Sequence, residues 1–153
     1  MNNVLFKPEL LQIASYKLLK LNIENLNEDQ NEDKDVSFTL KNSIELSFNS
    51  PNKLIKSKLD ISISRLSDIK SEVLARASIT VEYLFLVENF EELHYIEDNG
   101  TFKVNQSLTE SIKAIVYSTT RGLLMDRFKD TPFDGFILPI IDPRKDISDN
   151  ASK

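Results

Sequence analysis

The chain has 153 residues, a formal net charge of −5 and a sequence isoelectric point near 5.0. This length suits one domain spanning residues 1–153, and the acidic balance disfavours nucleic acid as a partner because its phosphates would be repelled. The sequence contains no cysteine, which excludes disulfides and thiolate metal sites, and no apolar run approaches the ~20 residues of a membrane span.

The first residues, MNNVLFKPELLQ, lack the basic region and apolar core of a signal peptide. We therefore expect a cytoplasmic protein with no membrane partner. Glycine is scarce, which argues against a glycine-rich nucleotide cradle. We expect no cofactor and no metal.

The first predicted element is a strand over residues 13–23, with Leu19, Leu21 and Ile23 on one side; a short helix is the less favoured alternative. An acidic loop over residues 24–35 follows, with six acids and one lysine in twelve positions. We expect this loop to be solvated, mobile and dispensable for folding. Its acids do not have the spacing of an EF-hand.

Residues 36–48 alternate between apolar and polar side chains, which predicts a strand with one dry and one wet face. The dry face carries Val36, Phe38, Leu40, Ile44, Leu46 and Phe48. A turn at 49–52 precedes a second alternating strand over 58–66, and a further turn follows at 67–71. The inward residues of the second strand are Leu59, Ile61 and Ile63.

The longest strand pattern spans residues 72–90. Its inward face carries Val73, Ala75, Ala77, Ile79, Val81, Tyr83, Phe85 and Val87. The other face begins polar and becomes apolar at Leu84 and Leu86. Since a monomer would leave one apolar face uncovered, we expect a helix layer or a partner subunit there.

After a turn at 98–100, Ser107 and Glu110 form a capping box that predicts the start of a helix ending near Phe128. Its expected apolar stripe is Ile112, Ile115, Val116, Thr119 and Leu123. Gly122 in the helix interior costs ~1 kcal/mol relative to alanine, which favours close approach of another backbone over a tolerated weakness. We assign to an oligomer interface Tyr83, Leu84, Leu86, Phe90 and Gly122.

Strands come first and the helix last. This order predicts an α+β fold, with a four-stranded antiparallel meander followed by one long helix. The sequence indicates no enzyme, because the single histidine, His94, lies in a predicted loop and no G-x-S-x-G motif occurs. We interpret the neighbouring carboxylates as solvated charge. These are Glu82, Glu88, Glu91 and Glu92.

Residues 131–143, TPFDGFILPIIDP, contain three prolines among apolar residues. The stretch has too many prolines for a helix or a central strand and is too apolar for a tail. We therefore predict an extended segment.

Residues 112–143 resemble a block of the SecB-type protein-export chaperones, in which a helix with an aromatic–x–x–x–Arg pattern precedes a turn and a proline-containing segment. The matching positions are Tyr117, Arg121, Pro132, Phe133, Leu138 and Pro139. The motif covers about thirty residues, while the order of strands and helix extends the similarity over most of the chain.

The resemblance implies a homotetramer, built as a dimer of dimers, that binds unfolded polypeptides in an apolar groove without ATP. It implies a role in protein folding and protein transport, or the care of a dedicated client such as an antitoxin. The residues we assign to client binding are Phe133, Phe136, Ile137, Ile44, Leu46 and Phe48. An ordinary core position is the alternative for each, most of all for Ile44 and Leu46.

The sequence departs from the family pattern after the proline-rich segment. The family carries a second helix and a tail that docks the translocation ATPase SecA, whereas here only a short polar tail, residues 144–153, follows. This departure puts SecA in doubt as a partner and makes the chain most similar to SecB-like proteins that lack the helix. A non-enzymatic module that binds one folded protein partner is the alternative function, and an enzymatic or ligand-binding α+β domain is disfavoured.

Overall fold

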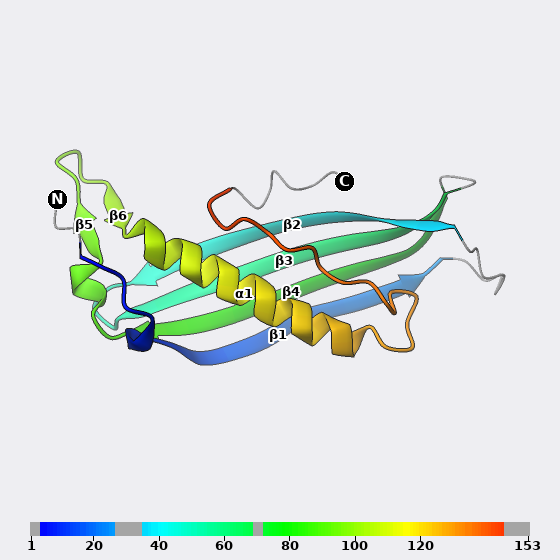
Figure 1. The fold of residues 1–153 in the computed structure, drawn as a ribbon, viewed down its shortest axis with the longest axis horizontal. Coiled ribbons are helices and arrows are strands. Elements are labelled where there is room, and N and C mark those ends of the chain that lie inside the picture. The colour runs from blue at the N-terminus through cyan, green and yellow to red at the C-terminus, as the bar shows by residue number, and fades with distance from the viewer. Residues whose placement is uncertain (1–3, 27–34, 69–71, 146–153) are drawn as a thin grey trace.

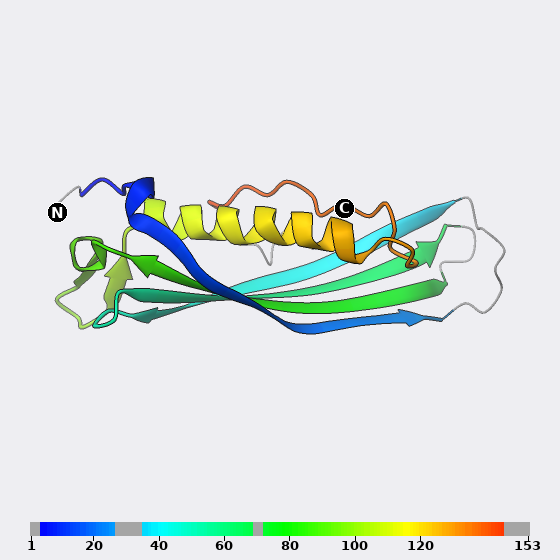
Figure 2. The same cartoon turned by 90° about the horizontal axis from the view of Figure 1, so that it is seen from below.

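The computed structural model describes residues 4–26, 35–68 and 72–145. A four-stranded antiparallel sheet forms one layer, and a single long helix, α1 (Gln106–Arg127), crosses one face of it (Figures 1 and 2). Residues 129–145, which we call the C-terminal segment, run back over the same face. The predicted α+β fold is confirmed.

The sheet has the order β1-β4-β3-β2. Its strands are β1 (Leu11–Asn25), β2 (Val36–Asn49), β3 (Leu54–Ser67) and β4 (Val73–Val87). The predicted meander holds for β2, β3 and β4, whereas β1 pairs with β4 instead of β2. Strand β1 precedes the meander in the chain and lies beside its last strand, β4, so the sheet has the strand order of a Greek key.

The two faces of the sheet differ in polarity. The inward positions of β3 and β4 are buried under α1, and most of them were predicted: Leu59, Ile61, Ile63, Ala75, Ala77, Ile79, Val81, Tyr83, Phe85 and Val87. Ile55, outside the predicted strand, is buried as well, whereas the predicted inward residue Val73 is only half-buried and its neighbour Leu74 is buried, because the β3–β4 register shifts there. On the outer face, register places Glu45 beside Lys58, Lys58 beside Glu82, and Glu82 beside Lys17. Alternating charge across four strands is favourable between neighbours and suits a solvated face.

Strand β1 carries two β-bulges, between Ile13 and Ser15 and between Leu18 and Lys20. Each extra residue moves the following side chains to the other face. The side chain of Leu18 therefore packs against the core, as do those of Leu21 and Ile23, while Leu19 is exposed. The prediction that Leu19 shares a side with Leu21 and Ile23 is wrong.

A short hairpin links the sheet to α1. It consists of β5 (His94–Ile96) and β6 (Phe102–Val104), and Gly100 takes a φ of 83° in its predicted turn. Two short 3-10 turns, η1 (Pro8–Leu10) and η2 (Phe90–Glu92), precede β1 and β5 respectively.

Asn105, not Ser107, caps α1. Its side-chain oxygen accepts a hydrogen bond from the Leu108 N–H at 3.1 Å, and Glu110 instead accepts one from the Gln106 amide at 2.7 Å. The predicted capping box is therefore wrong. Asn and Ser are comparable caps, so the hairpin that precedes the helix decides where it begins.

The buried side of α1 follows an i, i+4 row. It consists of Leu108, Ile112, Val116, Tyr117, Thr120 and Leu124. The predicted stripe was correct at Ile112 and Val116, which are buried, and at Ile115 and Leu123, which are half-buried against the core, but Thr119 is exposed. No helix among residues 4–26, 35–68 and 72–145 is long and apolar enough to cross a membrane.

Two predicted segments fall largely beyond the described residues. Of the acidic loop, positions 27–34 are not described, and Glu24 and Asn25 belong to β1. Of the polar tail, positions 146–153 are not described.

Candidate functional site

The C-terminal segment leaves α1 through a tight turn. The Thr131 hydroxyl donates to the Phe128 carbonyl at 2.7 Å and accepts from the Phe133 N–H at 3.1 Å. Asp130 and Gly135 take positive φ values of 60° and 83°. Glycine adopts this conformation without steric cost, and aspartate is one of the few other residues that tolerate it. The turn reverses the chain, so the segment runs back beside α1 and crosses the sheet obliquely toward β2 (Figure 1).

An aromatic cluster fastens the first part of the segment. The Phe136 ring lies 5.1 Å from the Phe38 ring of β2, and the Phe133 ring lies 5.4 Å from that of Phe128. These centroid separations are typical of favourable aromatic pairs. Phe133 has 0% exposure and Phe136 is half-buried. The structure therefore places Phe133 in the core, and we no longer assign it to an accessible groove.

Arg121 of α1 holds the segment by its main chain. Its Nε donates to the Leu138 carbonyl at 2.9 Å, and its Nη2 donates to the Pro139 carbonyl at 3.1 Å. A planar guanidinium with several donors in a fixed fork suits two adjacent acceptors. The arginine of the aromatic–x–x–x–Arg pattern thus has a defined structural partner in this chain.

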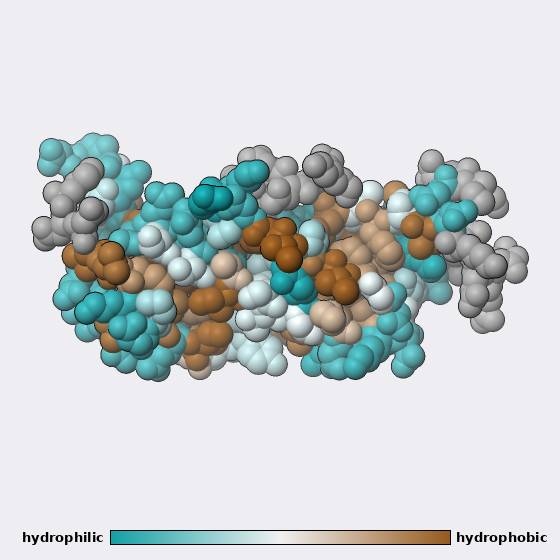
Figure 3. Space-filling model, in the orientation of Figure 1, coloured by the Kyte–Doolittle hydropathy of each residue, from teal (hydrophilic) through white to brown (hydrophobic). Residues whose placement is uncertain are grey.

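Two isoleucines of the segment remain accessible. Ile137 is 55% exposed and Ile140 is 89% exposed, while Leu138 between them is 1% exposed. Figure 3 shows hydrophobic surface gathered along the part of this face where the segment lies beside α1. Ile137 was assigned from the sequence, whereas Ile140 was missed because sequence does not show which side of an irregular segment faces the sheet.

The assigned residues of β2 follow Phe38 along the strand, and Phe48 lies at the opposite end of β2 from the aromatic cluster. Ile44 and Leu46 are half-buried at the edge of the core. Phe48 is 37% exposed, and its ring stacks at 6.2 Å on the buried Phe90. Since ten residues of a strand span about 33 Å, the structure does not bring Phe48 together with Phe38 and its aromatic partners.

Two polar contacts join α1 to the sheet inside the core. The Asn42 side-chain amide donates to the Tyr117 phenol at 2.8 Å, and the Tyr83 and Thr120 hydroxyls lie 2.9 Å apart. Burial raises the pKa of both tyrosines, so both phenols stay protonated at neutral pH. Sequence reasoning missed Asn42, although a single polar residue in the apolar face of a strand was the available signal.

The residues assigned to an oligomer interface separate into three environments. Tyr83 and Phe90 are buried within the chain. Leu84 and Leu86 are half-buried on the outer face of the sheet. Gly122 is exposed on α1, and a Cβ added there would meet no atom within 4 Å. The described part of this chain therefore does not supply the close backbone contact that we predicted for Gly122.

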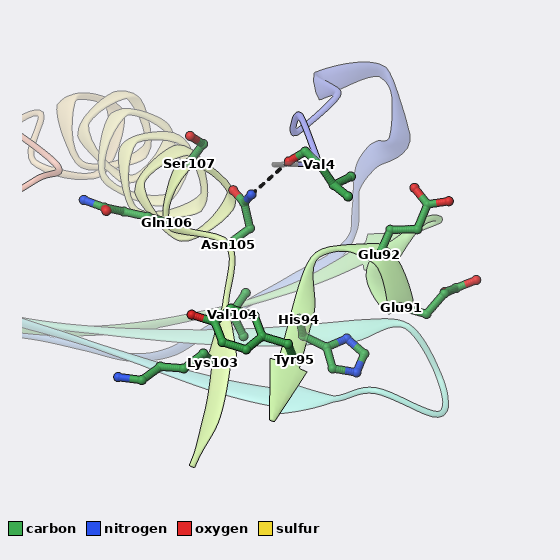
Figure 4. A pocket seen from close by; sticks show the side chains of 10 residues that line it. All are labelled: Val4, Glu91, Glu92, His94, Tyr95, Lys103, Val104, Asn105, Gln106 and Ser107. Atoms are coloured by element: carbon green, nitrogen blue, oxygen red, sulfur yellow. Dashed lines mark hydrogen bonds between the residues drawn. The ribbon is translucent and has the colours of Figure 1, made fainter. Parts of the chain in front are cut away.

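A cavity of about 1040 Å³ lies between the β5–β6 hairpin and the start of α1 (Figure 4). Both ring nitrogens of His94 have partners, with Nδ1 2.7 Å from the Phe90 carbonyl and Nε2 3.1 Å from the Ser50 hydroxyl. The pKa of Glu91 is lowered by its own backbone N–H and by Lys53. His94 therefore connects the hairpin to η2 and to the turn between β2 and β3 through these two contacts.

Figure 4 shows that polar and apolar side chains both line the cavity, with Val4 and Val104 among the apolar ones. Tyr95 and Lys103 come from the hairpin strands, and Gln106 and Ser107 come from the first turn of the helix. Among residues 4–26, 35–68 and 72–145 there is no group of three or more side chains suited to holding a metal ion.

Comparison with solved structures relates this arrangement to a chaperone fold. The Mycobacterium tuberculosis Rv1957 SecB-like chaperone, in complex with a ChAD peptide from the Rv1956 HigA1 antitoxin, matches with a TM-score of 0.62 at 12% sequence identity. The match covers 87% of this chain and 91% of that chain. No family model matches the sequence, and no curated protein does so either.

The shared architecture is the antiparallel sheet followed by one long helix. The protein therefore has a SecB-like fold, as the resemblance in residues 112–143 predicted.

Proposed function

We propose that this protein is a non-enzymatic, ATP-independent chaperone of the cytoplasm that binds unfolded or aggregation-prone polypeptides. The binding surface, which we call the apolar strip, consists of Ile137 and Ile140 of the C-terminal segment together with Ile44 and Leu46 of β2. The observation that carries the proposal is an extended apolar segment, fixed through its main chain, that leaves two isoleucines in solvent on a SecB-like fold.

The solved neighbour supports the choice of ligand class, because it is a SecB-like chaperone in complex with a peptide from an antitoxin. For the present chain, a dedicated client of that kind and a wider range of export clients are both consistent with an extended apolar surface. Binding of one particular polypeptide would indicate the dedicated role, and binding of many unrelated unfolded polypeptides would indicate the wider one.

The physical basis of binding is burial of apolar area, at ~25 cal/mol per Å² before the ordering costs of both partners are subtracted. The affinity then depends on the length of client chain in contact with the surface, and not on a pocket specific for one side chain. Such a complex weakens little with added salt, because screening acts on charges.

We also propose that the protein assembles into a homotetramer, a dimer of dimers. Two different surfaces are available for two kinds of interface. One is the outer face of the sheet at Leu84 and Leu86, and the other is the exposed side of α1 at Gly122.

The test is suppression of aggregation of several unrelated denatured proteins. The double variant Ile137→Ser with Ile140→Ser should lose most of this activity while its circular dichroism stays unchanged, because both side chains are exposed. The matched control is Tyr95→Ser with Ile96→Ser, which removes two exposed apolar side chains from the β5–β6 hairpin.

Equal activity of both double variants would contradict the assignment of the strip. A wild-type protein that holds no unfolded client and captures one folded partner would replace the chaperone by the alternative interaction module. Phe133→Ser cannot serve here, because a buried aromatic residue is lost with it.

A further inference from the structure

Burial along the C-terminal segment has a period of three between Ile137 and Ile141. Ile137 and Ile140 are exposed, whereas Leu138 is buried and Ile141 packs against the core, and no turn or bend interrupts residues 136–142. A β-strand alternates between its two sides and would place Ile140 inward with Leu138. A period of three is that of polyproline II. Both exposed isoleucines therefore lie on one side of the segment.

The main chain between the two isoleucines is restrained at two successive peptide units. The Leu138 carbonyl belongs to the unit that precedes Pro139, and the Pro139 carbonyl belongs to the unit that precedes Ile140. Arg121 donates to the first at 2.9 Å and to the second at 3.1 Å. The proline ring fixes its own φ and keeps the residue before it extended. These restraints set the direction in which the Ile140 side chain leaves the segment.

We propose that Arg121 is a positioning residue of the client-binding surface, which keeps Ile140 turned outward on the same side as Ile137. This inference rests on the proposed function, because it explains how the apolar strip obtains its geometry. The segment is a fixed wall of that surface and stays in place when a client binds.

The exposed position of Ile140 needs such a restraint. Ile140 is 89% exposed, and burial of an isoleucine side chain is favourable. A strand-like relaxation of the segment would turn it inward beside Leu138. Hydrogen bonds from a charged donor are stronger than neutral ones, so the two bonds of Arg121 oppose this relaxation. A surface that is already ordered binds more tightly, because ordering is not added to the binding step.

The first measurement is made on the full chain without any client. A soluble paramagnetic agent relaxes exposed methyl groups, so the relaxation of the Ile140 δ1 methyl in NMR reports its exposure. Arg121→Ala should reduce this relaxation at Ile140 and leave it unchanged at Ile96, which lies on the β5–β6 hairpin and is 69% exposed. The control Arg127→Ala removes the same charge from an exposed position of the same helix and should change neither methyl.

The second measurement is the dissociation constant for reduced, carboxymethylated α-lactalbumin, a permanently unfolded probe. Ile140→Ser should weaken binding about tenfold, the scale of one buried apolar side chain. Arg121→Ala should weaken it to a similar extent. The double variant should also be about tenfold weaker than the parent, because Arg121 acts through Ile140. Independent effects would multiply to about a hundredfold.

Two further variants complete the comparison. Arg127→Ala should bind the probe as the parent does. Arg121→Lys should fall between the parent and Arg121→Ala, because an ammonium lacks the planar fork. If circular dichroism shows that Arg121→Ala does not fold, Arg121→Lys takes its place, and its combination with Ile140→Ser should bind no more weakly than Ile140→Ser alone.

Unchanged relaxation of the Ile140 methyl in Arg121→Ala would overturn the positioning role. Multiplication of the two losses would overturn it as well, since Arg121 would then act on the client or on the fold independently of Ile140. Probe binding by Arg121→Ala equal to that of the parent has the same consequence.

These outcomes differ from failure of the proposed function. If the parent binds the probe and any of them occurs, the inference fails and the chaperone function stands. If the parent does not bind the probe, the chaperone function fails and the role of Arg121 in client binding fails with it.

Discussion

Asn42 on β2 donates a 2.8 Å hydrogen bond to the phenol of Tyr117 on α1, inside the core. Tyr117 lies one turn before Arg121, so the two project from the same side of the helix. One stretch of α1 therefore fixes the edge strand through the tyrosine and the C-terminal segment through the arginine.

Asn42→Leu should destabilise the fold by about 1–3 kcal/mol, because it leaves the buried Tyr117 phenol without its partner. Urea unfolding measures this loss. Tyr117→Phe alone should also destabilise the protein.

The double variant Asn42→Leu with Tyr117→Phe supplies the control, because it removes both polar groups and leaves no unpaired one. It should be more stable than the sum of the two single losses implies, with a coupling of about 0.5–3 kcal/mol. Simple additivity would show that the hydrogen bond contributes no coupling.

Asn105→Ala should lower the free energy of unfolding by about 1 kcal/mol, through loss of the helix cap. The side-chain amide of Asn105 also donates to the Val4 carbonyl at 3.1 Å (Figure 4), so the start of the chain should loosen as well. Thermal unfolding measures the first effect and hydrogen exchange the second. Ser107→Ala is the matched control and should change little; a larger loss there would restore Ser107 as the cap.

The strands were predictable because burial imposes a period of two. The alternation of β2, β3 and β4 survives in the structure with the faces assigned from the sequence, except at the start of β4, where Leu74 is buried in place of Val73. Strand β1 was predictable in extent only, since its two bulges move Leu18 and Leu19 relative to the apolar pattern. Pairing of β1 with β4 depends on contacts between distant parts of the chain, and local patterns do not report them.

The candidate site was harder to predict than the fold. The composition of residues 131–143 indicated an extended apolar segment, and the structure has one. Which side chains face inward has no periodic signal in an irregular segment, so Phe133 was assigned to the surface and Ile140 was overlooked. The partners of Arg121 are main-chain carbonyls. Every residue has such a carbonyl, so the sequence does not indicate which ones Arg121 contacts.

Arg144→Gln should raise the pKa of Asp142 from about 2 toward its ordinary value of 3.8. The Arg144 side chain and backbone N–H both bond the ionised carboxylate and lower its pKa. Because the folded-state pKa is depressed, the associated stabilisation is present above about pH 4 and is lost as the pH falls through about 2. NMR titration of the Asp142 carboxyl carbon checks this, and an unchanged pKa in the variant would show that Arg144 is not the cause.

Gly122→Glu should reduce the mass of the assembly in light scattering, because it puts a charge into a surface that we propose to be an interface. The isolated chain has room for the side chain, since an added Cβ meets no atom within 4 Å. Leu86→Glu tests the outer face of the sheet in the same way. A wild-type protein that is monomeric at micromolar concentration would contradict the proposed assembly.

Site-specific photocrosslinking tests the central claim, that unfolded polypeptides bind on the helix side of the sheet beside the C-terminal segment. Benzoylphenylalanine replaces Ile140 in one protein and Ser62, which is exposed on the outer face of β3, in another. Reduced, carboxymethylated α-lactalbumin should crosslink efficiently from position 140 and hardly at all from position 62. Equal crosslinking from both positions, or crosslinking from position 62 alone, would contradict the account.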